Sequence, residues 1–468
     1  MKRSRLALFG AMILCAGAAM PALAQRSPYT NSLDADEPGG VIYEAGVIEF
    51  VRTTPELRSI LDRARPLDPN NVAAPKFALR TRDNSFILSI GGQINPILGY
   101  DISNDLYDTD AKGSFVVGDI PVPPQRGKKG AFFIDPLEGY IDFTVVGFAG
   151  TKNEVTGYIK LGTNGANHNS VLKRAYVSWR GVTAGLTATL MKDALAAQPP
   201  TIDPQGPCGD VSATAYAIDY VSPSFSGFRF AAGIEMPTFY SSNGLYRGKD
   251  YRHHLYYGKQ VTSEANQLVP DIPAWVEYAA SSSNRVRLSG LLRNFAYYDL
   301  VSEKTRRLVG WGAMLSGNFS FYKPLTFNFQ AAYGKGIANY IQDIAGRPLS
   351  FTPKEDDPGR MTANPMMGLV FGASWNISKR LQVNAVGSYS RIWDVGAYAD
   401  IDDTLTQAGE ANYRSGIYVA ANCFYNITSY LQWGVEYLYG RHQTWTFGSA
   451  NDLSLIHISE PTRLGMIS

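Results

Sequence analysis

The chain has 468 residues, of which 45% are hydrophobic and 12% aromatic, and only 18% are charged. Its formal net charge is +2, and it falls to about −1 when the three basic residues of a predicted N-terminal signal are removed. A nearly neutral chain argues against a nucleic-acid partner, because binding to nucleic acid requires a strongly basic surface. Abundant Gly, Tyr and Phe indicate a β-rich protein, either secreted or embedded in an outer membrane.

Residues 1–24 predict a secretory signal peptide. Three basic residues precede an apolar run, and the small-residue sequence ALA at 22–24 precedes Gln25. This arrangement predicts cleavage after Ala24 and export of the mature chain. An N-terminal membrane anchor is the alternative, but the apolar run is shorter than a bilayer span.

Residues 25–80 are predicted to form a periplasmic segment with one short helix. In TTPELRSILDRAR, which begins at Thr53, Thr53 and Glu56 have capping-box spacing and a proline suits the first turn. Leu57, Ile60 and Leu61 share one face. A helix this short does not predict a coiled coil, which needs several heptads.

From Phe86 onward the sequence alternates with a period of two. Apolar and polar side chains fall on opposite faces in FILSIGGQINPILGY (86–100), PLTFNFQAAY (324–333), LQVNAVGSY (381–389) and LQWGVEYLYG (431–440). Aromatic residues recur near the ends of these segments, as they do in the girdles of membrane barrels. Tight turns also alternate with long connections, as in outer-membrane proteins and unlike a soluble sandwich.

The fold predicted is all-β, a transmembrane antiparallel up-and-down β-barrel of about 16 strands that covers residues 81–452. Fifteen strands are expected near 86–100, 138–147, 155–162, 171–179, 185–192, 215–221, 228–236, 272–279, 285–297, 307–319, 325–334, 366–375, 381–391, 413–425 and 431–440. Bacterial single-chain barrels have even numbers of strands. A sixteenth, closing strand is therefore expected after residue 440.

The last sixteen residues, 453–468, do not continue the alternating pattern. Leu453 to Arg463 reads LSLIHISEPTR, which resembles the translation of a transposase-type sequencing adapter. We therefore expect 453–468 to be a non-native tail in the place of the closing strand, with the closing strand itself missing.

Several of the segments resemble one known family. RLSGLLRNFAYYD (287–299), GWGAMLSGNF (310–319), LTFNFQAAYGKGIANYIQD (325–343) and VEYLYGRH (435–442) are similar to strands and turns of DcaP-like trimeric outer-membrane porins. LKRAYVSW (172–179), followed by PPTIDPQGPCG (199–209), resembles the run into the third loop of that family. The resemblance implies a sixteen-stranded homotrimer in the outer membrane of a Gram-negative bacterium. It also implies passage of small hydrophilic solutes, in some members anions such as dicarboxylates.

The same alternation predicts which charges face the channel. Arg285 and Arg287 alternate with apolar residues that would face lipid, so they are expected to point inward. The six candidates for a basic pore lining are Lys160, Arg174, Arg229, Arg285, Arg287 and Arg293. A basic wall concentrates anions, which predicts a mild anion preference. The alternative is that these residues pair with lumen carboxylates such as Glu235 and Glu277 and only fill the interior.

Residues 193–214 are predicted to be the third outer loop. Its Pro- and Gly-rich stretch has the stiffness of a loop that folds into a barrel and narrows it, with Asp203 and Asp210 as the charged candidates. An ordinary surface loop is the alternative. Cys208 lies in this loop and Cys423 in a strand, and nothing in the sequence places them close enough to predict a disulfide.

The function predicted is passive diffusion of small hydrophilic solutes through a porin, with no cofactor and no metal. His253 and His254 lack the partners of a zinc site, and none of the five histidines accompanies a convincing nucleophile, so no enzyme is predicted. The first alternative is a non-conducting receptor or adhesion barrel with a plugged lumen. A barrel hydrolase is a weaker alternative.

Overall fold

The computed structural model describes residues 41–45, 48–52, 57, 60–61, 77–83, 85–102, 115–120, 130–164, 169–193, 196, 199–241, 244–246, 255–256, 259–263, 266–281, 283–354, 356–357, 359–396, 413–428, 431–445 and 451–464. The predicted signal peptide and His253-His254 lie outside these residues. In the part of the chain that is described, no helix has the length and apolar character needed to cross a bilayer.

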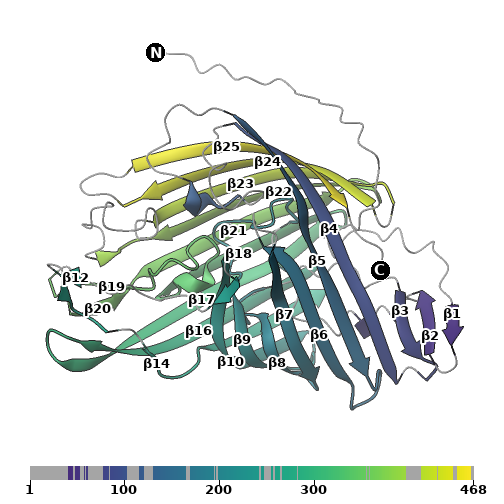
Figure 1. The fold of residues 1–468 in the computed structure, drawn as a ribbon, viewed down its shortest axis with the longest axis horizontal. Helices are drawn as coiled ribbons and strands as arrows, with labels where there is room; N and C mark the ends of the chain where they lie inside the picture. The colour runs from purple at the N-terminus through teal and green to yellow at the C-terminus, as the bar shows by residue number, and fades with distance from the viewer. Residues whose placement is uncertain are drawn as a thin grey trace.

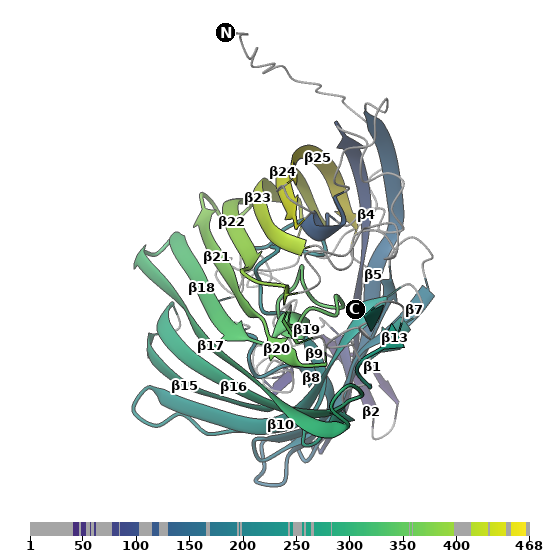
Figure 2. The ribbon, with the colours of Figure 1, turned by 90° about the vertical axis from the view of Figure 1, so that its left-hand side faces the viewer.

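A closed ring of antiparallel strands forms the body of the molecule (Figures 1 and 2). Its sixteen strands are β4 (Phe86–Asp101), β5 (Ala131–Gly147), β6 (Val155–Asn164), β7 (Asn169–Trp179), β8 (Val182–Ala188), β9 (Thr214–Val221), β10 (Phe228–Ser241), β15 (Ile272–Ser281), β16 (Asn284–Asp299), β17 (Lys304–Tyr322), β18 (Leu325–Lys335), β21 (Pro365–Asn376), β22 (Leu381–Ile392), β23 (Tyr413–Asn426), β24 (Leu431–Thr444) and β25 (Asn451–Leu464). Each pairs with the next, and β25 pairs back with β4. All fifteen strands predicted from residue 86 onward are present, most of them longer than predicted. The exception is the strand predicted over 185–192, because β8 begins at Val182 and ends at Ala188, so that residues 189–192 belong to the third loop.

A strand closes the barrel at the position where we expected the closing strand to be missing. Residues 451–464 form β25, which pairs with β24 from Thr444 to Leu431 and with the distal half of β4 from Asp101 to Ile94. The ladder uses backbone N–H and C=O groups, so a segment without side-chain alternation can still form it. The non-native origin of 453–468 stays a prediction.

The N-terminal part contains strands that the sequence pattern did not predict. β1 (Val41–Ala45), β2 (Ile48–Arg52) and β3 (Phe77–Thr81) form an antiparallel set, and β3 pairs with the proximal half of β4. Of the predicted helix, the structure describes only three residues, all in helical conformation. Two of these, Leu57 and Leu61, are buried against Ile87 and Val146 at the same end of the barrel.

Short elements complete the structure. They are β11 (Gly244–Tyr246) and β14 (Asn266–Gln267) at the sheet margin, the pairs β12 (Leu255–Tyr256) with β13 (Lys259–Gln260) and β19 (Phe351–Pro353) with β20 (Met361–Ala363), and the 3-10 turns η2 (Val117–Asp119) and η4 (Ala338–Tyr340).

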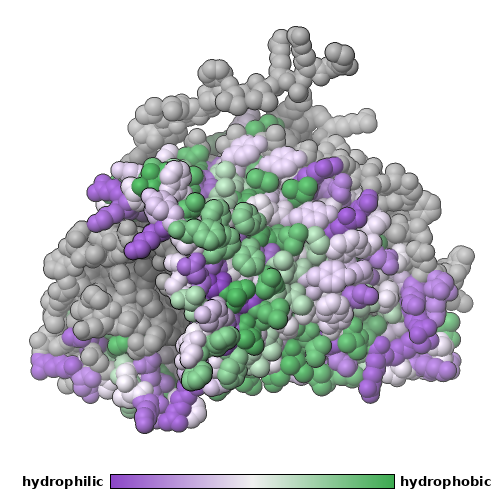
Figure 3. All heavy atoms as spheres, turned by 180° about the vertical axis from the view of Figure 1, so that it is seen from behind, coloured by the Kyte–Doolittle hydropathy of each residue, from purple (hydrophilic) through white to green (hydrophobic). Residues whose placement is uncertain are grey.

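The barrel wall has an apolar outer face and a more polar inner face. On β15 the outward Val276 and Tyr278 are exposed, whereas the inward Trp275 and Glu277 are buried. Apolar residues dominate the centre of the face in Figure 3, and strongly hydrophilic residues gather mainly at its edges. An apolar band of this kind suits a hydrocarbon environment, so the outer face is the lipid-facing one.

Candidate functional site

All six basic residues singled out from the sequence lie on the inner face of the barrel. They occupy the positions that alternate with exposed apolar side chains such as Val286 and Leu288. Arg285, Arg287 and Arg293 are buried, whereas Lys160, Arg174 and Arg229 are half-buried.

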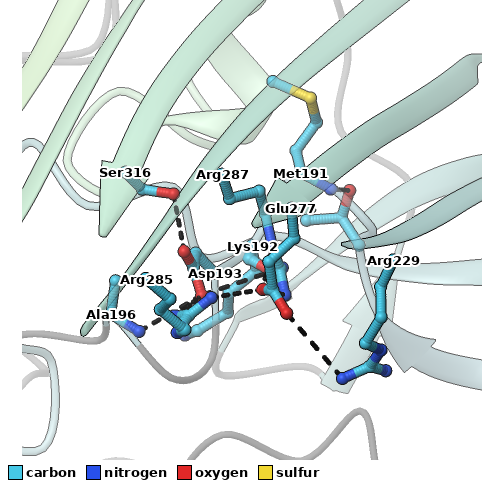
Figure 4. A network of polar contacts seen from close by, with 10 residues as sticks. Met191, Lys192, Asp193, Ala196, Arg229, Glu277, Arg285, Arg287 and Ser316 are labelled. Atoms are coloured by element: carbon cyan, nitrogen blue, oxygen red, sulfur yellow. Dashed lines mark hydrogen bonds and ion pairs between the residues drawn. The ribbon is translucent and has the colours of Figure 1, made fainter. Parts of the chain in front are cut away.

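Asp193 begins a network that fastens the third loop (residues 189–213, between β8 and β9) to the wall (Figure 4). Arg285 donates hydrogen bonds to both Asp193 and Glu277. Arg287 donates from Nε and Nη2 to Glu277 Oε2, over 3.0 and 2.7 Å. Ser316 Oγ donates to Asp193 Oδ2 over 2.6 Å. The root of the third loop is therefore held by β15, β16 and β17.

Electrostatics keep this loop carboxylate ionised. Burial raises the pKa of Asp193, but the positive charges of Arg287 and Arg285 outweigh the effect of burial and lower the pKa to about 2. Removing one member of such a buried network leaves an unpaired charge, at a cost of about 3–5 kcal/mol.

Arg229 lies at the edge of the same cluster and is its most exposed guanidinium. Its Nη1 is 3.8 Å from Glu277 Oε1, and its side chain is 33% exposed against 7% for Arg287. Arg287 is instead covered by Trp275, with its guanidinium 4.1 Å from the ring centroid. Three guanidinium groups face two carboxylates in this cluster, which leaves one positive charge that Arg229 presents to the interior.

Lys160 and Arg174 lie side by side on β6 and β7, as cross-strand neighbours on the inner face. Lys160 Nζ is 3.8 Å from the centroid of the Tyr140 ring, and Arg174 Nη1 donates to Thr214 Oγ1 over 2.8 Å. Both side chains keep part of their surface exposed to the interior.

Arg293 has a different position and anchors the sixth loop (residues 336–364, between β18 and β21). Its Nε lies 2.8 Å from Asp271 Oδ2, and its Nη1 donates to the carbonyl oxygen of Gly336 over 2.6 Å. Tyr340 Oη donates to the same Asp271 oxygen over 2.7 Å. The charge of Arg293 is thus neutralised and enclosed, so it holds a loop and does not face the lumen.

The two carboxylates proposed from sequence as partners of the basic residues behave differently. Glu277 pairs with three guanidinium groups, as that alternative required. Glu235 instead accepts hydrogen bonds from Thr189 Oγ1, over 2.5 Å, and from the backbone N–H of Leu190, over 3.3 Å. Glu235 therefore positions the third loop.

The third loop crosses the barrel interior and reaches the opposite wall at β22, β23 and β24. The backbone N–H groups of Ile202 and Asp203 donate to the Glu436 carboxylate over 2.9 and 2.7 Å. The Asp203 carboxyl accepts hydrogen bonds from Phe115 N and Tyr418 Oη, over 2.9 and 3.0 Å. Burial raises the pKa of Asp203 to about 7. Asp203 therefore joins two loops to the wall.

Asp210, the other acidic candidate, lies in the returning half of the third loop. Its Oδ2 is 3.6 Å from Lys192 Nζ, and burial raises its pKa against the effect of that ammonium group. The preceding Gly209 donates from its N–H to Ser388 Oγ over 2.8 Å. A Cβ atom on Gly209 would lie 2.5 Å from the carbonyl oxygen of Tyr389, so only glycine allows this close approach.

Two further loops fold inward, and sequence reasoning missed both. In the first loop, residues 115–120 contact the sixth loop through Asp119 and Arg347, 2.7 Å apart, and through the N–H of Gly118, which donates to Asp343 over 3.0 Å. The sixth loop in turn forms a β-bridge with the third, between Ile341 and Val211. Three loops therefore brace one another inside the wall.

The sixth loop carries a sequence feature that could have revealed its position. Four of its large aliphatic residues are at most 1% exposed, namely Ile337, Ile341, Ile344 and Leu349. They pack with inward side chains of β16, β17, β18 and β21 in one apolar cluster. A solvated loop would not carry so many large aliphatic residues. Figure 2 shows the hairpin β19–β20 of this loop within the ring of strands.

Other predicted features are placed as follows. Cys208 is buried in the third loop, Cys423 lies on the outward side of β23, and both are free. Within the described part of the chain, no group of three or more His, Cys, Asp or Glu is placed to hold a metal ion.

A ring of about sixteen antiparallel strands, apolar outside and narrowed by inward-folded loops, is the fold of outer-membrane porins and channels of Gram-negative bacteria. Among solved structures, the chain is similar to the outer-membrane channel DcaP of Acinetobacter baumannii, with a TM-score of 0.60 and 16% identity over 82% of this chain and 99% of that one. This likeness shows the shared fold.

Two other solved structures are more distant. One is an anion-selective porin from Comamonas acidovorans, with a TM-score of 0.49 and 12% identity over 81% of this chain and 100% of that one. The other is OmpT of Vibrio cholerae, with a TM-score of 0.47 and 10% identity over 82% of this chain and 98% of that one. No protein-family model matches the chain. No curated protein matches it in sequence either.

Proposed function

We propose that this chain is an outer-membrane porin through which small hydrophilic solutes diffuse passively, with a mild preference for anions such as dicarboxylates. The fold shared with the DcaP channel supports a conducting barrel. The observation that carries the anion preference is the excess positive charge of the cluster around Glu277, whose most exposed guanidinium is that of Arg229, on the inner wall beside the root of the third loop. Lys160 and Arg174 add positive charge on another part of the same inner face.

The narrowest part of this channel would lie where the first, third and sixth loops meet. Positive groups on the inner wall of such a channel attract anions, because field lines are focused in a narrow low-dielectric tube. The channel needs no nucleophile or cofactor, so we propose a non-enzymatic function.

Planar-bilayer recording in a salt gradient tests this proposal. Discrete conductance steps with a reversal potential of the sign expected for anions would support it. A clear cation preference would overturn the proposed anion selectivity. Conductance steps without preference for either ion would support a porin that is not selective.

A second candidate is a receptor or adhesion barrel that does not conduct. It is favoured by the interior packing, because two buried apolar clusters join inward loops to the wall. Absence of conductance from barrels that are shown to be folded by their gel mobility would favour this candidate over the porin.

We propose a homotrimer in the membrane, which rests on the resemblance to trimeric porins. Native mass spectrometry of the detergent-extracted protein gives the number of chains directly. A monomeric mass under conditions that preserve known trimeric porins would overturn it.

A further inference from the structure

On β15 to β24, the outward positions that the structure describes carry charge of one sign, and at one end of the barrel only. Along β15 to β24, the outward positions that the structure describes contain no carboxylate. Four of them are basic, namely Arg307, Lys335, Arg391 and Arg441. All four lie towards the end of the barrel that carries the long connections, such as the sixth loop, and this is the end that faces outward in a porin.

Aromatic rings mark the level of the membrane surface at the same place. Trp311, Tyr333 and Trp393 form a continuous row, with ring centroids 5.9 and 5.7 Å apart. Such rings prefer the boundary between hydrocarbon and headgroups. Lys335 is the cross-strand neighbour of Trp311, and the guanidinium of Arg391 lies 5.6 Å from the Trp393 centroid. The cations therefore sit at headgroup level.

Two of these cations, Lys335 and Arg391, lie within reach of one another. Strands in a sheet are about 4.8 Å apart, so Lys335 on β18 and Arg391 on β22, separated by β21, are about 10 Å apart across the sheet. Their long side chains can converge on one anionic group or turn outward to the headgroups. Arg307 lies four residues before Trp311 on β17, about 13 Å further towards the outer end of the strand, where it would meet a second anionic group.

The protein groups that the structure describes do not compensate the charges of Arg307, Lys335 and Arg391. Among the described residues, neither Arg307 nor Lys335 has an ion-pair partner, and Nε of Arg391 has no hydrogen-bond acceptor. The acidic residue nearest in sequence to Arg391, Asp394, accepts a hydrogen bond from the N–H of Gly396. A second copy of the chain could not neutralise the patch with this same face, because the described outward positions of β15 to β24 include no carboxylate.

We propose that Arg307, Lys335 and Arg391, a set we call the rim patch, bind the phosphate groups of lipids in the outer leaflet. Guanidinium and ammonium groups are the usual protein ligands of phosphate, and the aromatic row would pack against the adjoining sugar or acyl region. The inference goes beyond the proposed porin function and requires only that the barrel is embedded in an outer membrane.

The test compares lipid A that carries both phosphates with the same lipid after enzymatic dephosphorylation. Each is titrated into the full-length protein in detergent, and bound lipid is counted by native mass spectrometry. One variant carries Arg307→Gln, Lys335→Gln and Arg391→Gln. Its matched control carries Lys323→Gln, Lys379→Gln and Arg380→Gln, three exposed charges in the tight turns at the opposite ends of the same group of strands.

A basic residue near an anionic membrane surface contributes about fivefold to binding, so the rim-patch variant should bind diphosphorylated lipid A about 100-fold more weakly. The control variant should bind like the unaltered protein, and the dephosphorylated lipid should bind equally weakly to all three. Equal losses in both variants, or unchanged binding in the rim-patch variant, would overturn the proposal.

A failure of folding is distinguished by heat-modifiable mobility on gels and by a variant that keeps the charge, Lys335→Arg with Arg391→Lys. This variant should retain most of the binding if charge is what matters. Conductance of the same preparations reports the porin function separately, because the rim patch lies outside the lumen.

Discussion

Asp119 and Arg347 form an ion pair of 2.7 Å inside the barrel, although 228 residues separate them in the sequence. The pair joins the first loop to the sixth, and Nε of Arg347 also donates to the carbonyl oxygen of Asp343 over 3.1 Å. A guanidinium in this position holds two loops in one arrangement. The width of the interior at this level therefore depends on a contact between loops as well as on the wall.

Replacement of this guanidinium should loosen the constriction. In Arg347→Met, Asp119 loses its partner, and because the pair is partly exposed we expect a loss of about 1 kcal/mol in loop docking. Single-channel recording should show a larger mean conductance and more frequent transitions than in the unaltered protein. Arg360→Met, an exposed change in the same loop, serves as the control. Identical traces for the two variants would contradict a bracing role for Arg347.

The network around Asp193 predicts sensitivity to acid. The folded-state pKa of Asp193 is lowered from 3.8 to about 2, so its stabilising contribution is complete above pH 3.8 and is lost as the pH falls through about 2. The shift corresponds to roughly 2.5 kcal/mol. The free energy of unfolding of Asp193→Asn, measured in urea with lipid micelles, should therefore be lower than that of the unaltered protein at pH 7. The difference should shrink towards pH 2, and a difference independent of pH would refute this account.

Arg229 offers the sharpest test of selectivity. Arg229→Glu changes the cluster at the root of the third loop from one excess positive charge to one excess negative charge, and it places a carboxylate near Glu277. The ratio of anion to cation permeability, measured as a reversal potential in a potassium chloride gradient, should fall several-fold and more steeply at low salt. Arg380→Glu, the same change in an exposed turn, should leave the ratio unaltered. A ratio that moves equally in both variants would point to net charge and not to a lumen site.

The strands and the inner face could be predicted from the sequence, because both depend on the alternation of apolar and polar residues, which is visible within each short segment. The half-buried Lys160, Arg174 and Arg229 illustrate this. The partners of the buried arginines could not be predicted in full. Glu277 is ten residues from Arg287 and on the neighbouring strand, but Asp193 reaches the same cluster only because the third loop turns inward. Long-range contacts of this kind leave no periodic trace in the sequence.

The close approach of Gly209 to the wall predicts a steric effect at the centre of the third loop. In Gly209→Ala the new Cβ would meet the carbonyl oxygen of Tyr389 at 2.5 Å and the backbone N of Leu369 at 2.7 Å, so the loop must shift away from β21 and β22. Loss of the hydrogen bond to Ser388 accompanies this shift, for a destabilisation of about 1–3 kcal/mol. Gly387→Ala is the matched control, because a Cβ there meets nothing within 4 Å. We expect Gly209→Ala to lower the temperature at which the folded band disappears from gels and to change single-channel conductance, while Gly387→Ala does neither. If both variants behave like the unaltered protein, the third loop does not lie against β21 and β22 in the membrane.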